Sequence, residues 1–300
     1  MRVAITGSGG FLGSRIVSYY QNRELEGQGK AEFLPLKHRE IVLTDEEALR
    51  RFWESRQPDV LICCGAVSDT KACMEAPQAS FQINVEIPKV LAKVCSRYHT
   101  KLLFCSSDQV YFKEGESFQK EHFHTEDEKV QPKGIYGQQK LRAEQEILDR
   151  CPEAAVLRLS WLYDWKSHEK EHGTLVSTIL DNVQNGRNFQ YPVYDFRSIT
   201  DVWEVVQNLE PALSLPGGVY NFGSRNEGST YEIACKVMEL LSADKSLLSE
   251  NREAFQGCPR NIRMDMGKLE GFRISFLSTT EGLGKSFMYS QEQNPFKRMQ

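Results

Sequence analysis

The chain has 300 residues, 40% of them hydrophobic and 26% charged, and a formal net charge of -4. This composition is typical of a globular protein with a sizeable core in one large or two smaller domains. It disfavours nucleic acid or an anionic membrane as the main partner, and no run reaches the roughly 18 to 20 apolar residues of a membrane span. We expect a small-molecule ligand, and a cytoplasmic location because no apolar signal segment opens the chain.

A glycine-rich turn lies between a predicted strand at 3–6 and a predicted helix that ends near Arg23. Its spacing is G-x-x-G-x-x-G, because the rival G-x-G-x-x-G meets a leucine at its third glycine position. Glycines let the backbone turn sharply and approach a pyrophosphate, and the following helix N-terminus offers free N–H donors. The turn therefore predicts a dinucleotide site formed by Gly7, Gly9, Gly10, Phe11, Leu12 and Gly13.

The end of the second predicted strand, 33–36, indicates which dinucleotide binds. An NAD site usually has an Asp or Glu there to hold the ribose 2′-hydroxyl. This chain instead has Lys37, His38 and Arg39, and Arg15 after the last glycine could assist them. Because cations suit a 2′-phosphate, we expect NADP(H) rather than NAD. The alternative is that these residues are solvated loop charges.

Short apolar runs alternate with helical patterns through the first half of the chain. Further strands are expected at 60–64, 102–105 and 156–159, and helices at 77–98 and 136–148. This order predicts a Rossmann-type doubly wound parallel α/β sheet. Beyond it, a strand at 189–193, a helix at 201–213, a strand at 218–222 and a helix at 230–241 are expected.

The loosening of this pattern after about residue 164 suggests a division into lobes. We assign 1–164 to a cofactor-binding domain to which 200–224 returns. Segments 165–199 and 225–290 form a smaller substrate-binding lobe over the carboxyl ends of the strands, and 291–300 is a polar tail.

Eight cysteines and the absence of any C-x-x-C pair favour buried free thiols over disulfides or a zinc site. No metal ligand set is expected.

Three side chains are candidates for carbonyl reduction. Tyr136 and Lys140 are four residues apart, on one face of a predicted helix. A nearby cation lowers the pKa of a phenol, which can then protonate the oxygen of a carbonyl that receives a hydride. Ser107 ends the strand before this helix, where its hydroxyl could bind the same oxygen. The alternative for Ser107 is a serine that satisfies a turn.

These motifs resemble the extended short-chain dehydrogenase/reductase family over nearly the whole chain. The glycine turn resembles its T-G-x-x-G-x-x-G, Ser107 falls at its catalytic Ser/Thr, and Tyr136 and Lys140 match its Y-x-x-x-K. Within the family the likeness is to the dTDP-4-dehydrorhamnose reductases, through three local segments: 105–111, 156–163 and 264–269.

The resemblance implies roles for further residues. Cys64, Gly65 and Ala66 would line the cofactor, together with Asn84 on the helix after the third strand, and Lys140 would also hold the nicotinamide ribose. The resemblance also implies a 4-keto sugar nucleotide as substrate and a possible homodimer. The residues facing the substrate would be Asp108, Trp161 and Arg197.

Segments 71–74 and 194–200 depart from the reductase pattern, so the sugar and its nucleotide stay open. A 4,6-dehydratase is disfavoured because Gln109 stands where an acid would be needed. An epimerase of the same family remains an alternative, since it can use the same Ser, Tyr and Lys. A further alternative, similar to the β regulatory subunit of methionine adenosyltransferase, is a protein that binds NADP without catalysis.

Overall fold

The computed structural model describes residues 1–25, 31–37, 42–113, 121–166 and 173–292. At its centre is a six-stranded sheet in the order β10-β5-β4-β3-β1-β2, and every pairing in it is parallel. The prediction of a doubly wound parallel sheet is confirmed. The strands are β1 (Arg2–Thr6), β2 (Glu32–Leu36), β3 (Val60–Cys63), β4 (Lys101–Ser107), β5 (Ala155–Leu159) and β10 (Gly218–Phe222).

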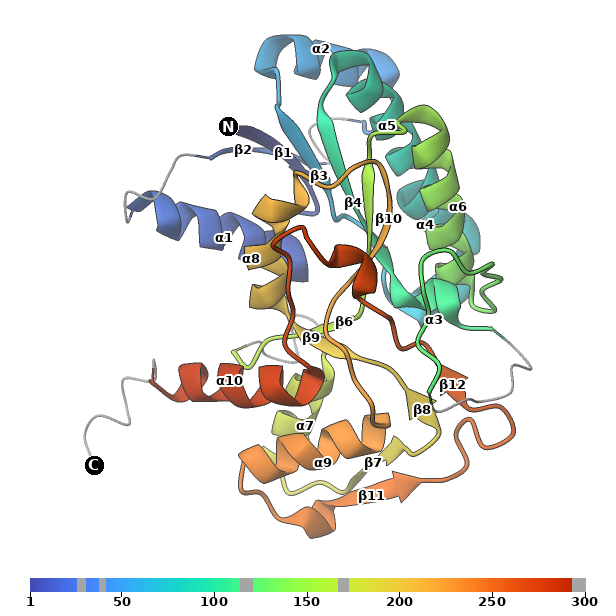
Figure 1. The fold of residues 1–300 in the computed structure, drawn as a ribbon, viewed down its shortest axis with the longest axis vertical. Helices are drawn as coiled ribbons and strands as arrows, with labels where there is room; N and C mark the ends of the chain where they lie inside the picture. Colours follow the sequence, from blue (N-terminus) through green and yellow to red (C-terminus); the bar gives the residue numbers. More distant parts are fainter. Residues whose placement is uncertain (26–30, 38–41, 114–120, 167–172, 293–300) are drawn as a thin grey trace.

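Helices cover both faces of this sheet (Figure 1). Helices α1 (Phe11–Leu25) and α8 (Val202–Ala212) bury apolar side chains such as Ile16 and Val205 against one face. On the other face lie α2 (Glu46–Arg56), α5 (Ile87–Tyr98) and α6 (Ile135–Arg150). Each fully buried aliphatic side chain contributes about 1.5–3 kcal/mol, so the two layers fix the sheet between them.

The segment predicted as one helix over 77–98 is interrupted. It contains α4 (Pro77–Phe81), a π-helical turn (Gln82–Glu86) and α5, and α3 (Thr70–Glu75) comes just before it. Pro88 has no N–H to donate to the carbonyl of residue 84, so the ordinary α-helical bond is missing there. The wider turn points the Asn84 side chain inward, where it is fully buried.

Smaller elements gather below the sheet in Figure 1. Three two-stranded parallel pairs, β6-β9, β7-β11 and β8-β12, lie with helices α7, α9 and α10. The division into lobes stays a prediction, and residues 293–300 of the expected tail lie outside the described residues. The smaller elements below the sheet are β6 (Trp161–Tyr163), α7 (Leu175–Gln184), β7 (Phe189–Pro192), β8 (Asp195–Phe196), β9 (Ile199–Asp201), α9 (Thr230–Leu240), β11 (Leu248–Asn251), β12 (Arg260–Asn261) and α10 (Thr279–Glu292).

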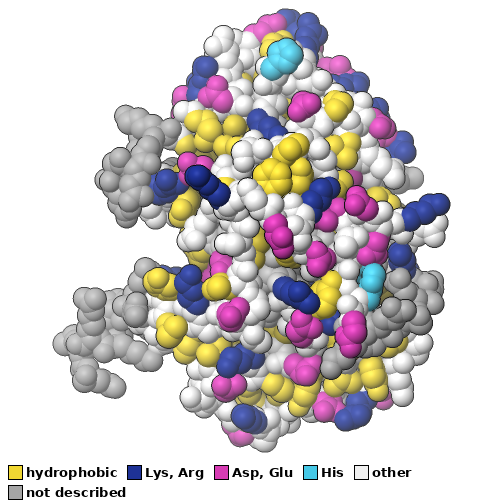
Figure 2. All heavy atoms as spheres, in the orientation of Figure 1, with side chains coloured by type: hydrophobic (Ala, Val, Ile, Leu, Met, Phe, Trp, Pro, Cys, Tyr) yellow, Lys and Arg dark blue, Asp and Glu magenta, His cyan; other side chains and the backbone are white. Residues whose placement is uncertain are grey.

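The face of the molecule in Figure 2 carries basic and acidic side chains side by side. Such mixing agrees with the small net charge and gives that face no extended field of one sign. Among the described residues, no helix has both the length and the apolar character needed to cross a bilayer.

Candidate active site

The cofactor candidates meet where the strand order reverses. Strand β1 pairs with β2 on one side and β3 on the other, and open α/β sheets bind ligands in the crevice beyond such a point. The turn after β1 and the loop after β3 touch there. Gly7 has φ +68°, and a Cβ on it would lie 2.7 Å from the Cα of Gly65. The Cys64 thiol donates to the carbonyl of Thr6 over 2.9 Å.

Helix α1 also approaches this turn closely. A Cβ on Gly13 would lie 2.1 Å from the carbonyl oxygen of Gly7, whereas one on Gly9 would meet nothing within 4 Å. The steric requirement therefore follows the G-x-x-G-x-x-G spacing. This close packing places the start of α1 directly against the turn after β1, the arrangement that pyrophosphate sites use.

Asn84 contacts both the loop after β3 and helix α6. Its carboxamide bonds both backbone groups of Val67, at 2.9 and 3.0 Å, and its Nδ2 donates to Oε1 of Gln139 over 2.8 Å. These are protein contacts, so Asn84 ties the loop after β3 to α6. We therefore treat it as a residue that positions the cofactor loop.

The cations expected at a 2′-phosphate are only partly described. Lys37 is exposed at the end of β2, while His38 and Arg39 lie outside the described residues. The assisting role of Arg15 stays a prediction; its Nε lies 3.1 Å from Oδ2 of Asp164, and its guanidinium lies over the Phe11 ring. This partly buried ion pair holds the Arg15 side chain against Asp164, the residue that follows β6.

The three catalytic candidates lie around the carboxyl end of β4. Ser107 ends that strand, and α6 supplies Tyr136 and Lys140. Gly137 makes this approach possible, because a Cβ there would lie 2.4 Å from the carbonyl oxygen of Gln109. Lys140 is buried, donates to the Cys105 carbonyl over 2.7 Å, and its Nζ lies 5.8 Å from the Tyr136 ring centre.

The electrostatics of this group differ from the sequence-based expectation. Burial, followed by the nearby Asp108 carboxylate, raises the pKa of Tyr136 above its usual value of 10. Burial also lowers the pKa of Lys140. The expected lowering of the phenol pKa by the ammonium is absent, because both groups have lost water and the ammonium bonds a carbonyl instead.

The substrate candidates come together next to Ser107. The Arg197 guanidinium lies 3.1 Å from Oδ2 of Asp108 and 4.8 Å from the Trp161 ring centre. Burial raises the pKa of Asp108, although Arg197 and Arg260 oppose the shift. Ser107 also serves its turn, since Oγ accepts from the Gln109 N–H and donates to Oδ1 of Asp108, each over 3.2 Å.

Two buried polar atoms on neighbouring residues have no hydrogen-bond partner among the described residues. Within the described part of the chain, the buried Nε of Arg197 and the buried Oγ of Ser198 make no hydrogen bond. A buried N–H without a partner costs about 1–3 kcal/mol, so this pair marks a place where a polar ligand atom would be stabilised.

Sequence reasoning missed the network that supports the site from behind. Glu144 on α6 holds Arg158 on β5 at 2.7 Å and accepts a hydrogen bond from Ser106, next to the catalytic candidate. The guanidinium also donates to the Tyr111 hydroxyl over 2.8 Å. A glutamate four residues after Lys140, on the same helix face, was the one available signal.

Known protein families include one whose sequence pattern matches most of this chain. A family model described as the RmlD substrate binding domain matches residues 1–270. The chain belongs to this family. The match spans the sheet and all of the smaller elements below it except α10, and the likeness to dTDP-4-dehydrorhamnose reductases inferred from local motifs is confirmed.

Two curated relatives and one solved structure illustrate the likeness. Methionine adenosyltransferase 2 subunit beta of Danio rerio is 27% identical over 297 residues, covering 93% of this chain and 87% of the relative. A dTDP-4-dehydrorhamnose reductase of Mycobacterium tuberculosis is 32% identical over 162 residues, which cover 54% of this chain and 50% of the relative. The Bacillus anthracis dTDP-4-dehydrorhamnose reductase in complex with NADP superposes with TM-score 0.80 at 19% identity, covering 96% and 99%.

Proposed function

We propose that this protein is an NADPH-dependent reductase that converts the 4-keto group of a deoxysugar nucleotide to an alcohol. The observation that carries the proposal is the grouping of Ser107, Tyr136 and Lys140 at the carboxyl end of β4, in a protein that also has a close-packed glycine turn after β1 and a buried arginine with an unpaired donor. A carbonyl held there would have hydroxyl donors on one side and the nicotinamide crevice on the other.

The residues around the crevice fit a dinucleotide. The glycine turn, with no room for a Cβ at two positions, would hold the pyrophosphate, and Lys37 with His38 and Arg39 would meet the 2′-phosphate. NADPH, when bound, supplies the hydride for the carbonyl carbon. A relative with this fold was solved with NADP, which supports the choice.

The protein's own groups would manage the proton. Ser107 would donate to the carbonyl oxygen, and Tyr136 would transfer its phenolic proton to that oxygen as negative charge develops. Because burial keeps the pKa of Tyr136 high, the phenol holds its proton at neutral pH. Lys140 lies close enough to stabilise the phenolate that remains.

Substrate selection would fall to the group around Arg197. Its unpaired Nε, the Asp108 carboxylate and the face of Trp161 offer a donor, an acceptor and an apolar surface, which are the features that bind a hydroxylated sugar ring.

The direct test adds dTDP-4-dehydrorhamnose to purified protein and NADPH and follows the cofactor's absorbance. We expect stoichiometric oxidation of NADPH and an alcohol product. Conversion of a sugar nucleotide without net NADPH consumption would identify the epimerase alternative instead.

A second candidate is a regulatory subunit that binds NADP without turnover. The likeness to methionine adenosyltransferase 2 subunit beta favours it, because that likeness extends over 93% of this chain. This candidate predicts NADPH binding by calorimetry, no turnover with any 4-keto sugar nucleotide, and co-purification with a larger partner protein.

A further inference from the structure

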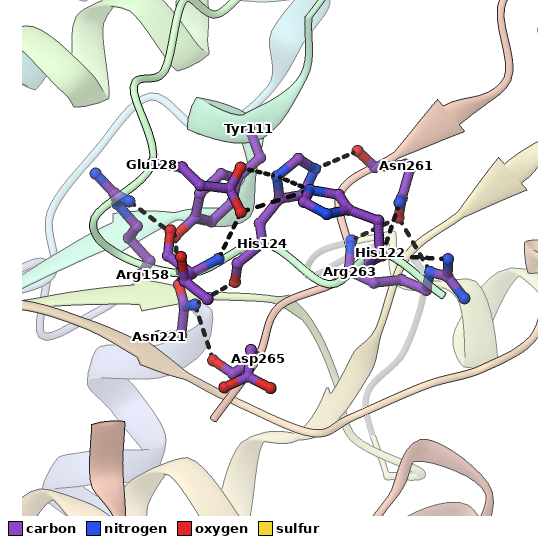
Figure 3. A network of polar contacts seen from close by, with 10 residues as sticks. Tyr111, His122, His124, Glu128, Arg158, Asn221, Asn261, Arg263 and Asp265 are labelled. Atoms are coloured by element: carbon purple, nitrogen blue, oxygen red, sulfur yellow. Dashed lines mark hydrogen bonds and ion pairs between the residues drawn. The ribbon is translucent and has the colours of Figure 1, made fainter. Parts of the chain in front are cut away.

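Two histidines and a glutamate lie close together in one segment, 121–128, and are not among the residues of the candidate active site. His122 is partly exposed, His124 is fully buried and Glu128 is mostly covered. Figure 3 shows both imidazole rings turned toward the Glu128 carboxylate. The sequence carries this group as H-x-H-x-x-x-E, a pattern without cysteine, whereas no metal ligand set was expected from the cysteines.

The spacing of the three groups matches a tetrahedral metal site. Nε2 of His122 lies 3.3 Å from Nδ1 of His124 and 3.5 Å from Oε1 of Glu128, and Nδ1 of His124 lies 2.8 Å from Oε2 of Glu128. Atoms bound about 2.0–2.1 Å from a tetrahedral zinc ion lie roughly 3.3 Å from one another. The separation of the two imidazole nitrogens already meets this value. The two distances to Glu128 involve different carboxylate oxygens, and the shorter one, to His124, needs to widen by about half an ångström.

The second nitrogen of His124 has its partner. Nε2 lies 3.0 Å from the carbonyl oxygen of Asn261, which can only accept, so Nε2 carries the hydrogen. The lone pair of the neutral ring is then on Nδ1, facing the carboxylate and the other imidazole. A metal ion placed between the groups would accept this lone pair together with those of His122 and of the carboxylate.

The surroundings hold the three groups as an outer layer of a metal site does. Oε1 of Glu128 accepts the N–H of Thr125 over 2.9 Å, and the Tyr111 ring stacks on His124 with centres 4.6 Å apart. Asn261 also donates its side-chain amide to the carbonyl of His122 over 2.9 Å. The bond from Nε2 of His124 to the Asn261 carbonyl is of the kind that metal-bound histidines characteristically make with their other N–H.

We propose that His122, His124 and Glu128 bind one divalent ion of the zinc class, with water in the fourth position. Two imidazoles and one carboxylate suit Zn²⁺, whereas Mg²⁺ prefers oxygen ligands. The ion would clamp segment 121–128 beneath Tyr111, and Tyr111 ends the short helical turn Asp108–Tyr111 that follows Ser107. Its role is therefore structural support of the candidate active site.

The test is Zn²⁺ binding to the metal-stripped full chain, measured by calorimetry and by the shift in Tm. Wild type should bind one equivalent and gain Tm, because a ligand specific for the folded state stabilises it. His122→Ala removes a partly exposed ring but keeps the backbone carbonyl that Asn261 and Arg263 contact. Glu128→Gln keeps an oxygen for the Thr125 N–H. Each should weaken Zn²⁺ binding at least tenfold, since loss of outer-layer partners alone costs about 10- to 100-fold.

The matched control is His99→Asn, at the left-handed C-cap of α5 that asparagine tolerates. His99→Asn should bind Zn²⁺ as tightly as wild type does, and Mg²⁺ should not shift the Tm of either of these two proteins. Equal Zn²⁺ affinity in all four proteins would place the metal on other groups, such as the partly exposed Cys235 and Cys258 thiols, and would overturn the proposal. Absence of Zn²⁺ binding by wild type would overturn it as well.

Discussion

Burial determines how the individual residues of the candidate active site behave. Tyr136, Lys140 and Asp108 are all buried, and for each of them desolvation is the largest influence on the pKa. The phenol and the Asp108 carboxyl are pushed toward their protonated forms, and the ammonium toward its neutral form. The free protein therefore keeps the Tyr136 phenol protonated, and a bound ligand that displaces the Lys140 contact with Cys105 would change this balance.

Tyr136→Phe should lower kcat by roughly 10²- to 10⁴-fold, the usual contribution of a positioned general acid. NADPH affinity should barely change, because only the phenolic hydroxyl is lost. Steady-state kinetics and calorimetry on the same preparation check both parts. Tyr98→Phe is the control, since that hydroxyl contacts Glu54 at the surface, 3.2 Å away. Unchanged turnover of Tyr136→Phe on a confirmed substrate would refute the reductase mechanism.

The cations after β2 predict a preference for NADPH over NADH. A charge-assisted hydrogen bond contributes about 1.5–3 kcal/mol, so replacing Lys37 and Arg39 by Ala should reduce NADPH affinity by about 10- to 100-fold or more. NADH affinity should stay the same. Lys236→Ala, which removes a surface cation paired with Glu239 on α9, serves as the control. If the unmodified protein bound both cofactors equally in calorimetry, the assignment of these cations would be wrong.

Close approach between secondary-structure elements builds the site. Helix α1 comes against the turn after β1 at Gly13, and α6 comes against the turn after β4 at Gly137, each with backbone in the place of a Cβ. Asn84 then fastens the loop after β3 to α6 through Gln139. A small change in the packing at any of these contacts would shift the neighbouring turn or loop relative to Tyr136.

Gly13→Ala should therefore separate α1 from the turn. Overpacking of this kind typically costs about 1–3 kcal/mol, and the displaced N–H donors should weaken NADPH binding. Gly9→Ala is the matched control, because the space around Gly9 is open. Urea unfolding and NADPH titration of both variants provide the measurements. Similar behaviour of the two variants would show that the glycine turn does not pack as described.

Buried polar side chains lie at the junctions between the sheet layers and the smaller elements below them. Asp201 lies at such a junction, where β9 ends and α8 begins, and its side chain caps α8 by accepting the Trp203 N–H over 2.9 Å. Burial first, and then the neighbouring Asp164 and Glu204, raise the pKa of Asp201 to about 7. Stability of the whole chain is therefore linked to pH at this carboxyl.

In the unfolded chain Asp201 ionises near pH 3.9, whereas the folded protein keeps its proton until about pH 7. Its contribution to stability is full below about pH 4 and is lost as the pH rises to about 7, by about 4 kcal/mol at most. Asp201→Asn keeps the capping oxygen and removes the titration. Urea unfolding across this range should show the variant gaining stability relative to wild type as the pH rises. A constant difference would contradict the raised pKa.

Local patterns in the sequence determined much of this protein. Alternating apolar runs and helical segments predicted all six strands of the sheet, and the glycine spacing predicted which positions have no room for a Cβ, because both signals depend on neighbours a few residues apart. The reading of Ser107, Tyr136 and Lys140 as one group also rested on local spacing and resemblance, and the structure brings them to one end of β4.

Tertiary structure alone decided the contacts and charges. Arg197 meets Asp108 across 89 residues, Arg15 turns to Asp164 across 149, and His124 finds its acceptor on Asn261 across 137. No periodicity encodes such pairs, because they arise when loops from different strands meet at one edge of a sheet. The direction of the Tyr136 pKa was missed for the same reason: it depends on how much water packing removes, and packing is a property of the folded chain.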